Sequence, residues 1–146
     1  MSKSVHVTAS NYAPGRHILL DLYDGRDFTN SSSIELALKN AATACKATIL
    51  NIHLHSFGEN AGITGIALLA ESHISIHTWP ERAYAAIDIF MCGDCEPENA
   101  LPSLLAHFRP AQHEIVVHRR GDARSHEQNK AKSPKLPPHL FDAKSC

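Results

Sequence analysis

The chain has 146 residues, the length of one domain, and can bury about 68–70% of the surface that the unfolded chain exposes. Its 14 Lys and Arg residues nearly balance 15 Asp and Glu residues, so a net charge of −1 provides no field that would attract nucleic acid or an anionic membrane. The sequence shows no signal peptide and no apolar run long enough to span a membrane, and we expect its four scattered cysteines to be free thiols. It therefore predicts a soluble cytoplasmic protein whose ligand is a small molecule.

The first third of the chain predicts an arm, a strand, a helix and a second strand. Residues 1–15 are rich in Ser, Asn, Pro and Gly without periodicity, which is typical of a flexible arm. A strand follows at about 17–23. Serine hydroxyls can cap a helix over about 33–46, where apolar residues recur at helical spacing. The stretch 48–57 alternates apolar and polar residues, which indicates a strand with one buried face, to which Leu50 belongs.

Three further strands are expected in the middle of the chain, at 63–70, 73–78 and 84–91, because β-branched and apolar residues alternate there with polar or small ones. Gly58 and Gly62 interrupt the chain before the first of them. Alternation also places His73 and His77 on one face of their strand, opposite the neighbouring isoleucines.

The last third predicts a helix beginning at Pro97, a strand at 114–118 and a tail at 122–146 that is nearly free of apolar residues and therefore disordered. Short connections between strands, with two helices inserted, predict an α+β fold. We expect a two-layer sandwich over 16–121, with a mainly antiparallel sheet and both helices on one face.

Groups capable of proton transfer are concentrated between positions 71 and 92. Ser72 follows Glu71, His77 lies five positions later, and Cys92 closes the next predicted strand. A thiol has an ordinary pKa of about 8.5 and is mostly protonated at neutral pH, so a cysteine can act as a proton donor there. An imidazole, with an ordinary pKa near 6.5, exchanges protons in both directions.

Two segments carry a family resemblance: GITGIALLAESHISIHTWPE at 62–81 and AAIDIFMCG at 85–93. They resemble the bacterial S-adenosylmethionine decarboxylase proenzymes, which depend on a pyruvoyl group, and the likeness extends more loosely over about 15–110. A decarboxylase of this kind needs a carbonyl that forms a Schiff base with the substrate and accepts electrons as CO2 leaves. The resemblance implies that the chain cleaves itself between Glu71 and Ser72, giving a β chain 1–71 and an α chain 72–146, with the pyruvoyl group made from Ser72.

The resemblance also assigns roles to individual residues. His77 matches the histidine that transfers protons during self-processing, and Thr64 matches a hydroxyl position that supports the same step. Cys92 matches the proton donor in decarboxylation. No metal is implied.

For the substrate, the resemblance implies an adenosyl group with a sulfonium cation, both of which aromatic faces attract. Phe57 and Trp79 match the aromatic residues that stack on adenine, and Glu81 matches a carboxylate that binds the ribose hydroxyls. The sequence departs from the family in the loop FGENAGIT at 57–64, which is one residue longer than the commoner form and lacks a proline. Thr64 stands where many members have serine.

The resemblance further implies a homodimer of processed chain pairs that serves spermidine synthesis, with Trp79 and Glu81 coming from the neighbouring protomer. Alternatives remain open from the residues alone. A pyruvoyl enzyme could decarboxylate arginine or ornithine instead. Cys92 and Cys95 form a C-x-x-C that could bind a metal or act in redox chemistry, and the protein could be a non-catalytic assembly protein in which Ser72 never reacts.

Overall fold

The computed structural model describes residues 15–92 and 94–121. The predicted arm, apart from Gly15, and the predicted tail at 122–146 lie outside the described residues. The strands and helices of the described part occur in this chain order: β1 Gly15–Tyr23, α1 Ser31–Ala44, β2 Ile49–Ser56, β3 Ile63–Leu69, β4 Ser72–Trp79, β5 Tyr84–Cys92, α2 Ala100–Phe108 and β6 Gln112–Arg120.

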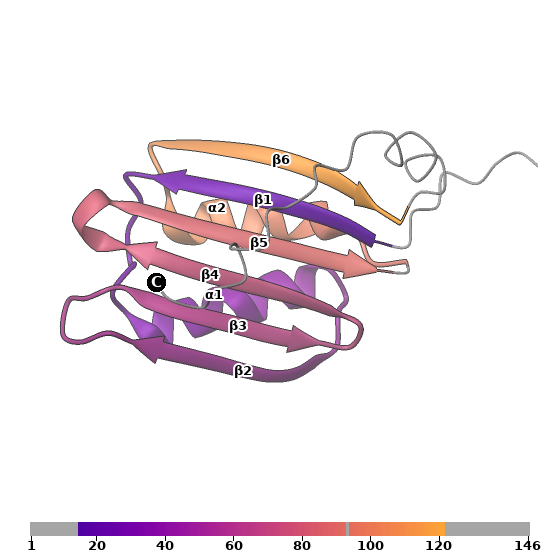
Figure 1. Ribbon diagram of the computed structural model, residues 1–146, viewed down its shortest axis with the longest axis horizontal. Coiled ribbons are helices and arrows are strands. Elements are labelled where there is room, and N and C mark those ends of the chain that lie inside the picture. The colour runs from indigo at the N-terminus through magenta and orange to yellow at the C-terminus, as the bar shows by residue number, and fades with distance from the viewer. Residues whose placement is uncertain (1–14, 93, 122–146) are drawn as a thin grey trace, which may run out of the picture.

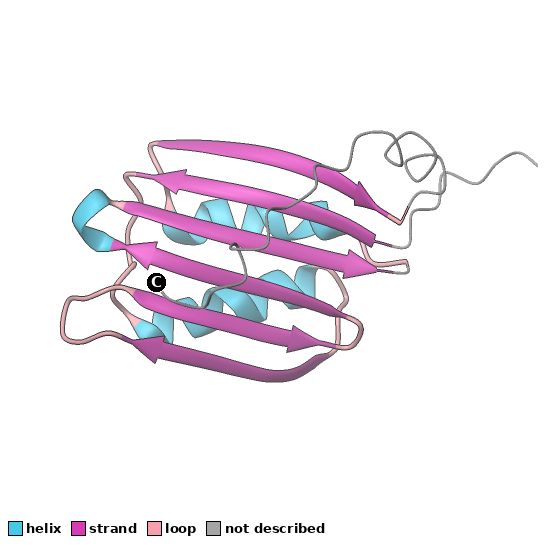
Figure 2. Cartoon of the chain, viewed as in Figure 1, coloured by secondary structure: helices cyan, strands magenta, loops and turns pink. Residues whose placement is uncertain are grey.

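The described strands form one antiparallel sheet in the order β2-β3-β4-β5-β1-β6. Figure 1 shows α1 and α2 side by side behind this sheet, and Figure 2 shows the same two layers by element type. The opposite face of the sheet carries no helix of the described chain, and we call it the open face. The predicted two-layer α+β sandwich is therefore confirmed.

Alternation along the central strands separates the hydrophobic core from the open face. In β4, Ile74 and Ile76 are fully buried beneath the helices, as are Ile87 and Ile89 in β5. The residues of β4 that alternate with these isoleucines, His73, Ser75 and His77, are only partly buried because they point to the open face. Period-two alternation thus places the polar residues of β4 and β5 on one accessible surface.

Several local features differ from the sequence-based expectation. Asn30, rather than a serine, caps α1, since its side chain accepts a hydrogen bond from the Ser33 backbone at 3.0 Å. A bulge between Ile49 and Asn51 turns Leu50 outward, although simple alternation placed it in the core. The second helix begins as a 3₁₀ turn, Pro97–Asn99, before α2 starts.

The strand β6 is longer than predicted and exposed at every residue, because it lies at the edge of the sheet and pairs only with β1 among the described strands. No helix in the described part of the chain is long and apolar enough to cross a membrane.

Candidate active site

Ser72 and Cys92 meet at one end of the central strands. Ser72 opens β4 directly after a two-residue turn from β3, while Cys92 is the last residue of β5. The Ser72 hydroxyl oxygen lies 3.8 Å from the Cys92 sulfur and accepts a hydrogen bond of 3.3 Å from the Cys92 backbone N–H. The Cys92 thiol also donates to the backbone carbonyl of Glu71. The serine and the thiol therefore contact the same peptide unit.

The residue before Ser72 has an unusual backbone conformation. Glu71 has φ of 58°, in the left-handed region that residues with a side chain rarely occupy. Such a conformation costs on the order of 1–3 kcal/mol and persists only where the surrounding structure imposes it. Here the tight β3–β4 turn imposes it, so the Glu71–Ser72 bond lies in a strained and accessible turn.

Thr64 and His77 meet at the other end of the same strands. They are directly opposite each other on β3 and β4, and the Thr64 hydroxyl lies 3.1 Å from His77 Nδ1. A cavity of about 310 Å³ opens beside them, and the aromatic residues Phe57 and Trp79 line it together with Glu81. The Trp79 ring centroid lies 6.1 Å from that of His77. The structure thus brings five predicted site residues together at this end.

A buried hydroxyl that sequence reasoning missed holds this second end in place. Thr78 Oγ1 donates to the carbonyl of Phe28 at 2.7 Å and accepts from the Ile63 N–H at 2.8 Å, linking three segments of the chain. Gly62 is also required there, because a Cβ at that position would collide with the Thr78 carbonyl oxygen. The alternation of β4 offered the signal, since a threonine between His77 and Trp79 must point into the core.

The two ends are far apart in one chain. Ser72 and His77 occupy the same strand, five residues apart, and a strand rises about 3.3 Å per residue. Their Cα atoms are therefore separated by roughly 16 Å, which no histidine side chain can span. The predicted site residues form two half-sites in the structure: Glu71, Ser72 and Cys92 at one end, and Phe57, Thr64, His77, Trp79 and Glu81 at the other.

Comparison with known proteins places this arrangement in a family. The family model described as S-adenosylmethionine decarboxylase matches residues 16–121, the whole span of the predicted domain. The chain belongs to the S-adenosylmethionine decarboxylase family. The predicted resemblance is confirmed.

Individual relatives agree with this assignment. The S-adenosylmethionine decarboxylase proenzyme of Methanococcus aeolicus is 44% identical over 110 residues, covering 73% of this chain and 93% of that protein. The proenzyme of Parasynechococcus marenigrum is 46% identical, covering 73% and 84%. The crystal structure of the adenosylmethionine decarboxylase from Aquifex aeolicus VF5 matches with a TM-score of 0.70 and 34% identity, over 77% of this chain and 94% of that one.

Polar residues between the two half-sites form a network on the open face of this family member. Asp88 accepts a hydrogen bond of 3.2 Å from Ser75 and lies 3.3 Å from Nε2 of His17. Burial, and secondarily the neighbouring His17, lower the pKa of His73, which stacks on Phe90. Sequence reasoning identified neither His17 nor Asp88, since the pairing of β1 with β5 brings them together across 71 positions.

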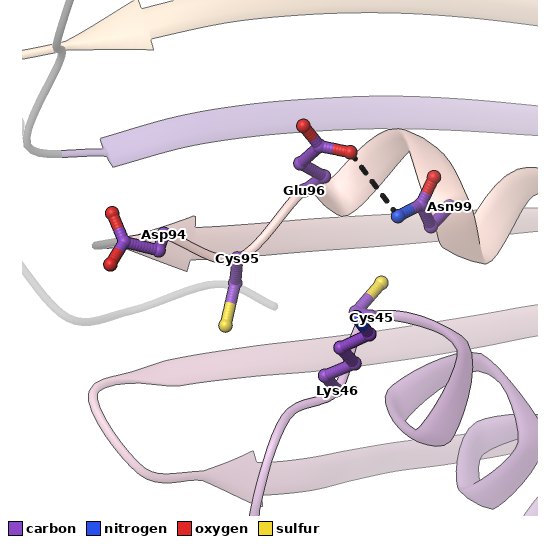
Figure 3. Close-up of a pocket in the computed structure, with 6 residues that line it drawn as sticks. All are labelled: Cys45, Lys46, Asp94, Cys95, Glu96 and Asn99. Atoms are coloured by element: carbon purple, nitrogen blue, oxygen red, sulfur yellow. Dashed lines mark hydrogen bonds between the residues drawn. The ribbon is translucent and has the colours of Figure 1, made fainter.

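The structure separates the two cysteines of the C-x-x-C sequence. Cys92 contacts Ser72, whereas Cys95 lines a different cavity of about 460 Å³ with Cys45 and Asp94, shown in Figure 3. Burial raises the pKa of Cys45 to about 11, and all three thiols are free. Within residues 15–92 and 94–121, no group of three or more His, Cys, Asp or Glu side chains is placed to hold a metal ion. The relatives of this chain, which are named S-adenosylmethionine decarboxylase proenzymes, do not favour the metal alternative.

Proposed function

We propose that the chain is a self-cleaving proenzyme that becomes an S-adenosylmethionine decarboxylase, with Ser72 as the source of its pyruvoyl group. The observation that carries this proposal is the contact of the Ser72 hydroxyl with the Cys92 thiol, which in turn donates to the carbonyl of Glu71, a residue with a left-handed backbone. Family membership supports it, because the relatives are named proenzymes of this activity.

Self-cleavage follows from the chemistry of the Ser72 hydroxyl, the Cys92 thiol and the Glu71 carbonyl. The Ser72 hydroxyl attacks the Glu71 carbonyl carbon, and the peptide bond becomes an ester with a free amine at residue 72. The Cys92 thiol, which donates to the Glu71 carbonyl oxygen, stabilises the negative charge that develops there. Loss of the Cα proton of Ser72 then expels the Glu71 carboxylate, and hydrolysis of the resulting enamine releases ammonia and leaves the pyruvoyl group.

The residues around position 72 fit a pyruvoyl group. Ser72 is 7% exposed and lies at a strand terminus, so a carbonyl there is shielded from bulk water yet open toward the surface beside Cys92. When formed, the group supplies an electron sink for the carbanion that CO2 leaves behind. The neighbouring Cys92 thiol delivers a proton to the substrate carbon, and so completes the reaction.

Cys92→Ala will separate the two steps. Self-cleavage becomes slower but continues, because Ser72 keeps its hydroxyl and the Glu71 strain remains. Turnover falls by about 10²–10⁴-fold, the usual contribution of a positioned proton donor. Intact mass spectrometry over time measures cleavage, and CO2 release from the cleaved fraction measures turnover. An unchanged turnover rate would remove Cys92 from the reaction, and Cys95→Ala serves as the matched control.

Two protomers complete the site. His77 lies too far from Ser72 of its own chain. If two copies pack with their open faces together, about a two-fold axis that lies between the sheets and runs perpendicular to the strands, each half-site meets the other half-site of the partner. The open face supports such pairing, since Ile66 and Leu68 on β3 are 40% and 49% exposed. In this dimer, the His77 of one copy assists cleavage at the Ser72 of the other.

The second half-site fits the adenosyl part of the substrate. Phe57 and Trp79 supply two aromatic residues to the lining of the cavity, and Glu81, which also lines it, has a carboxylate that can accept hydrogen bonds from ribose hydroxyls. An indole face also attracts the sulfonium cation. Arginine and ornithine offer neither an adenine ring nor a ribose to these residues.

A direct test combines the intact mass of the purified protein with CO2 release from a panel of candidate substrates. We expect purified protein to show two fragments, 1–71 and 72–146, the second lighter by one ammonia than a serine-terminated chain. We expect CO2 from carboxyl-labelled S-adenosylmethionine, and at most a trace from arginine or ornithine. A cleaved protein that acts only on a basic amino acid would retain the pyruvoyl chemistry and refute the substrate. A chain that stays intact on prolonged incubation would refute both.

A further inference from the structure

Three aromatic rings stack across three neighbouring strands on the open face. Trp79 of β4 lies directly opposite Tyr84 of β5, and Tyr84 lies opposite Tyr23 of β1. The ring centroids are 5.2 Å apart for Trp79 and Tyr84, with planes inclined by 21°, and 5.4 Å apart for Tyr84 and Tyr23, inclined by 24°. These separations are typical of stacked aromatic pairs. The rings therefore form a continuous row that ends at Trp79.

The middle ring of this row is held by a hydrogen bond. The Tyr84 hydroxyl donates to the Asp21 carboxylate at 2.5 Å, and both side chains are partly buried. Burial, followed by this bond to a negative charge, holds the pKa of Tyr84 well above its ordinary value, so the phenol remains a donor throughout the physiological range. With its ring stacked on both sides and its hydroxyl bonded, Tyr84 has little freedom to turn.

Trp79 also lines a cavity, and the residue is 39% exposed. The strand β3 flanks β4 on the side away from β5, and the chain there contributes Gly62, which has no side chain. The cavity of about 310 Å³ is lined by Gly62 and Phe57 as well as by Trp79. Tyr84 thus covers the indole from the β5 side, and the cavity approaches it from the β3 side.

We propose that Tyr84, held by Asp21, is a positioning residue that fixes the Trp79 indole as the wall on which the substrate's adenine stacks. The inference rests on the proposed function, which assigns adenine stacking to Trp79. Tyr84 touches no substrate atom in this proposal. It restricts Trp79 before the substrate arrives, so less conformational entropy is lost on binding.

The chain offers a direct readout, because Trp79 is its only tryptophan. In Tyr84→Leu, which removes the stacked ring, we expect lower fluorescence anisotropy and stronger acrylamide quenching of Trp79 in the substrate-free protein. We expect KM for S-adenosylmethionine to rise by about two- to tenfold, the range that corresponds to one aromatic pair. The value of kcat should stay near that of the wild type, because Ser72 and Cys92, which react with the substrate, lie at the other half-site.

Substitutions at Asp21 provide a matched pair with a smaller risk to folding. Asp21→Asn keeps an oxygen that accepts the Tyr84 hydrogen bond and should resemble the wild type, whereas Asp21→Leu cannot accept it and should shift both Trp79 fluorescence and KM toward Tyr84→Leu. Circular dichroism confirms that each variant is folded.

Two results would overturn the inference. Unchanged Trp79 fluorescence in folded Tyr84→Leu and Asp21→Leu would show that Tyr84 does not restrict the indole. Altered fluorescence with an unchanged KM would show that the restriction does not serve binding. A wild-type protein that fails to decarboxylate S-adenosylmethionine is a separate outcome: it refutes the proposed function, on which the inference depends, whatever the fluorescence shows.

Discussion

Ser72→Ala will remain a single uncut chain and will release no CO2 from S-adenosylmethionine. The substitution removes one partly shielded oxygen, so the core beneath β4, formed by Ile74 and Ile76, stays intact. Without the hydroxyl there is no nucleophile for the Glu71 carbonyl and no precursor of the electron sink. The expected loss is complete, since no other side chain in the turn can supply a carbonyl. Intact mass and labelled CO2 release measure it.

A serine on the same strand provides the control for this prediction. Ser75 lies on the open face and donates to Asp88, three residues beyond the proposed cleavage site. Ser75→Ala should cleave normally, which would show that loss of a β4 serine is not in itself disruptive. Measurable turnover in uncut Ser72→Ala protein would contradict the pyruvoyl assignment.

Local sequence patterns were sufficient to predict the elements and much of each half-site. Period-two alternation in β4 placed His77 on the same face as His73, and the strand predicted at 73–78 lies within β4, which begins one residue earlier, at Ser72. The family motif then linked Ser72 with Cys92, and the structure brings the two within 3.8 Å. The strands and helices could be predicted because their patterns depend on neighbours close in sequence, whereas the roles of Ser72 and Cys92 stay predictions.

Contacts between distant segments could not be predicted in this way. The bond between Tyr84 and Asp21 joins residues 63 positions apart, and it exists only because β1 inserts beside β5 rather than beside β2. Leu50 was misplaced for a different reason, since a bulge shifts the register and reverses the side that it faces. A spacing of five residues along a strand implies that Ser72 and His77 of one chain are roughly 16 Å apart, but it carries no information about which copy of the chain supplies each group.

Two inactive variants will restore activity when they are produced together in one cell. Ser72→Ala lacks the cleavage site, and His77→Ala lacks the assisting imidazole, so each homodimer has two defective sites. In a mixed dimer, one site joins the intact Ser72 of one copy with the intact His77 of the other, and its partner site carries both defects. Random pairing makes half of the dimers mixed, and one of the two sites in each mixed dimer is intact. About a quarter of all active sites in the sample should therefore be intact. CO2 release per dimer, and the fraction of cleaved chains, both measure this recovery.

The matched control pairs Ser72→Ala with Cys92→Ala. Those two residues belong to the same half-site, 3.8 Å apart, so no mixed dimer can bring an intact Ser72 together with an intact Cys92. This pair should show no more turnover than Cys92→Ala alone. Recovery in the first pair and not in the second is expected only if the two half-sites of one active site come from different chains. If neither pair recovers while mixed dimers are shown to form, each protomer must act alone, and His77 would have to act on Ser72 from roughly 16 Å, beyond the reach of direct proton transfer. That result would remove His77 from the processing step and the second copy from the site.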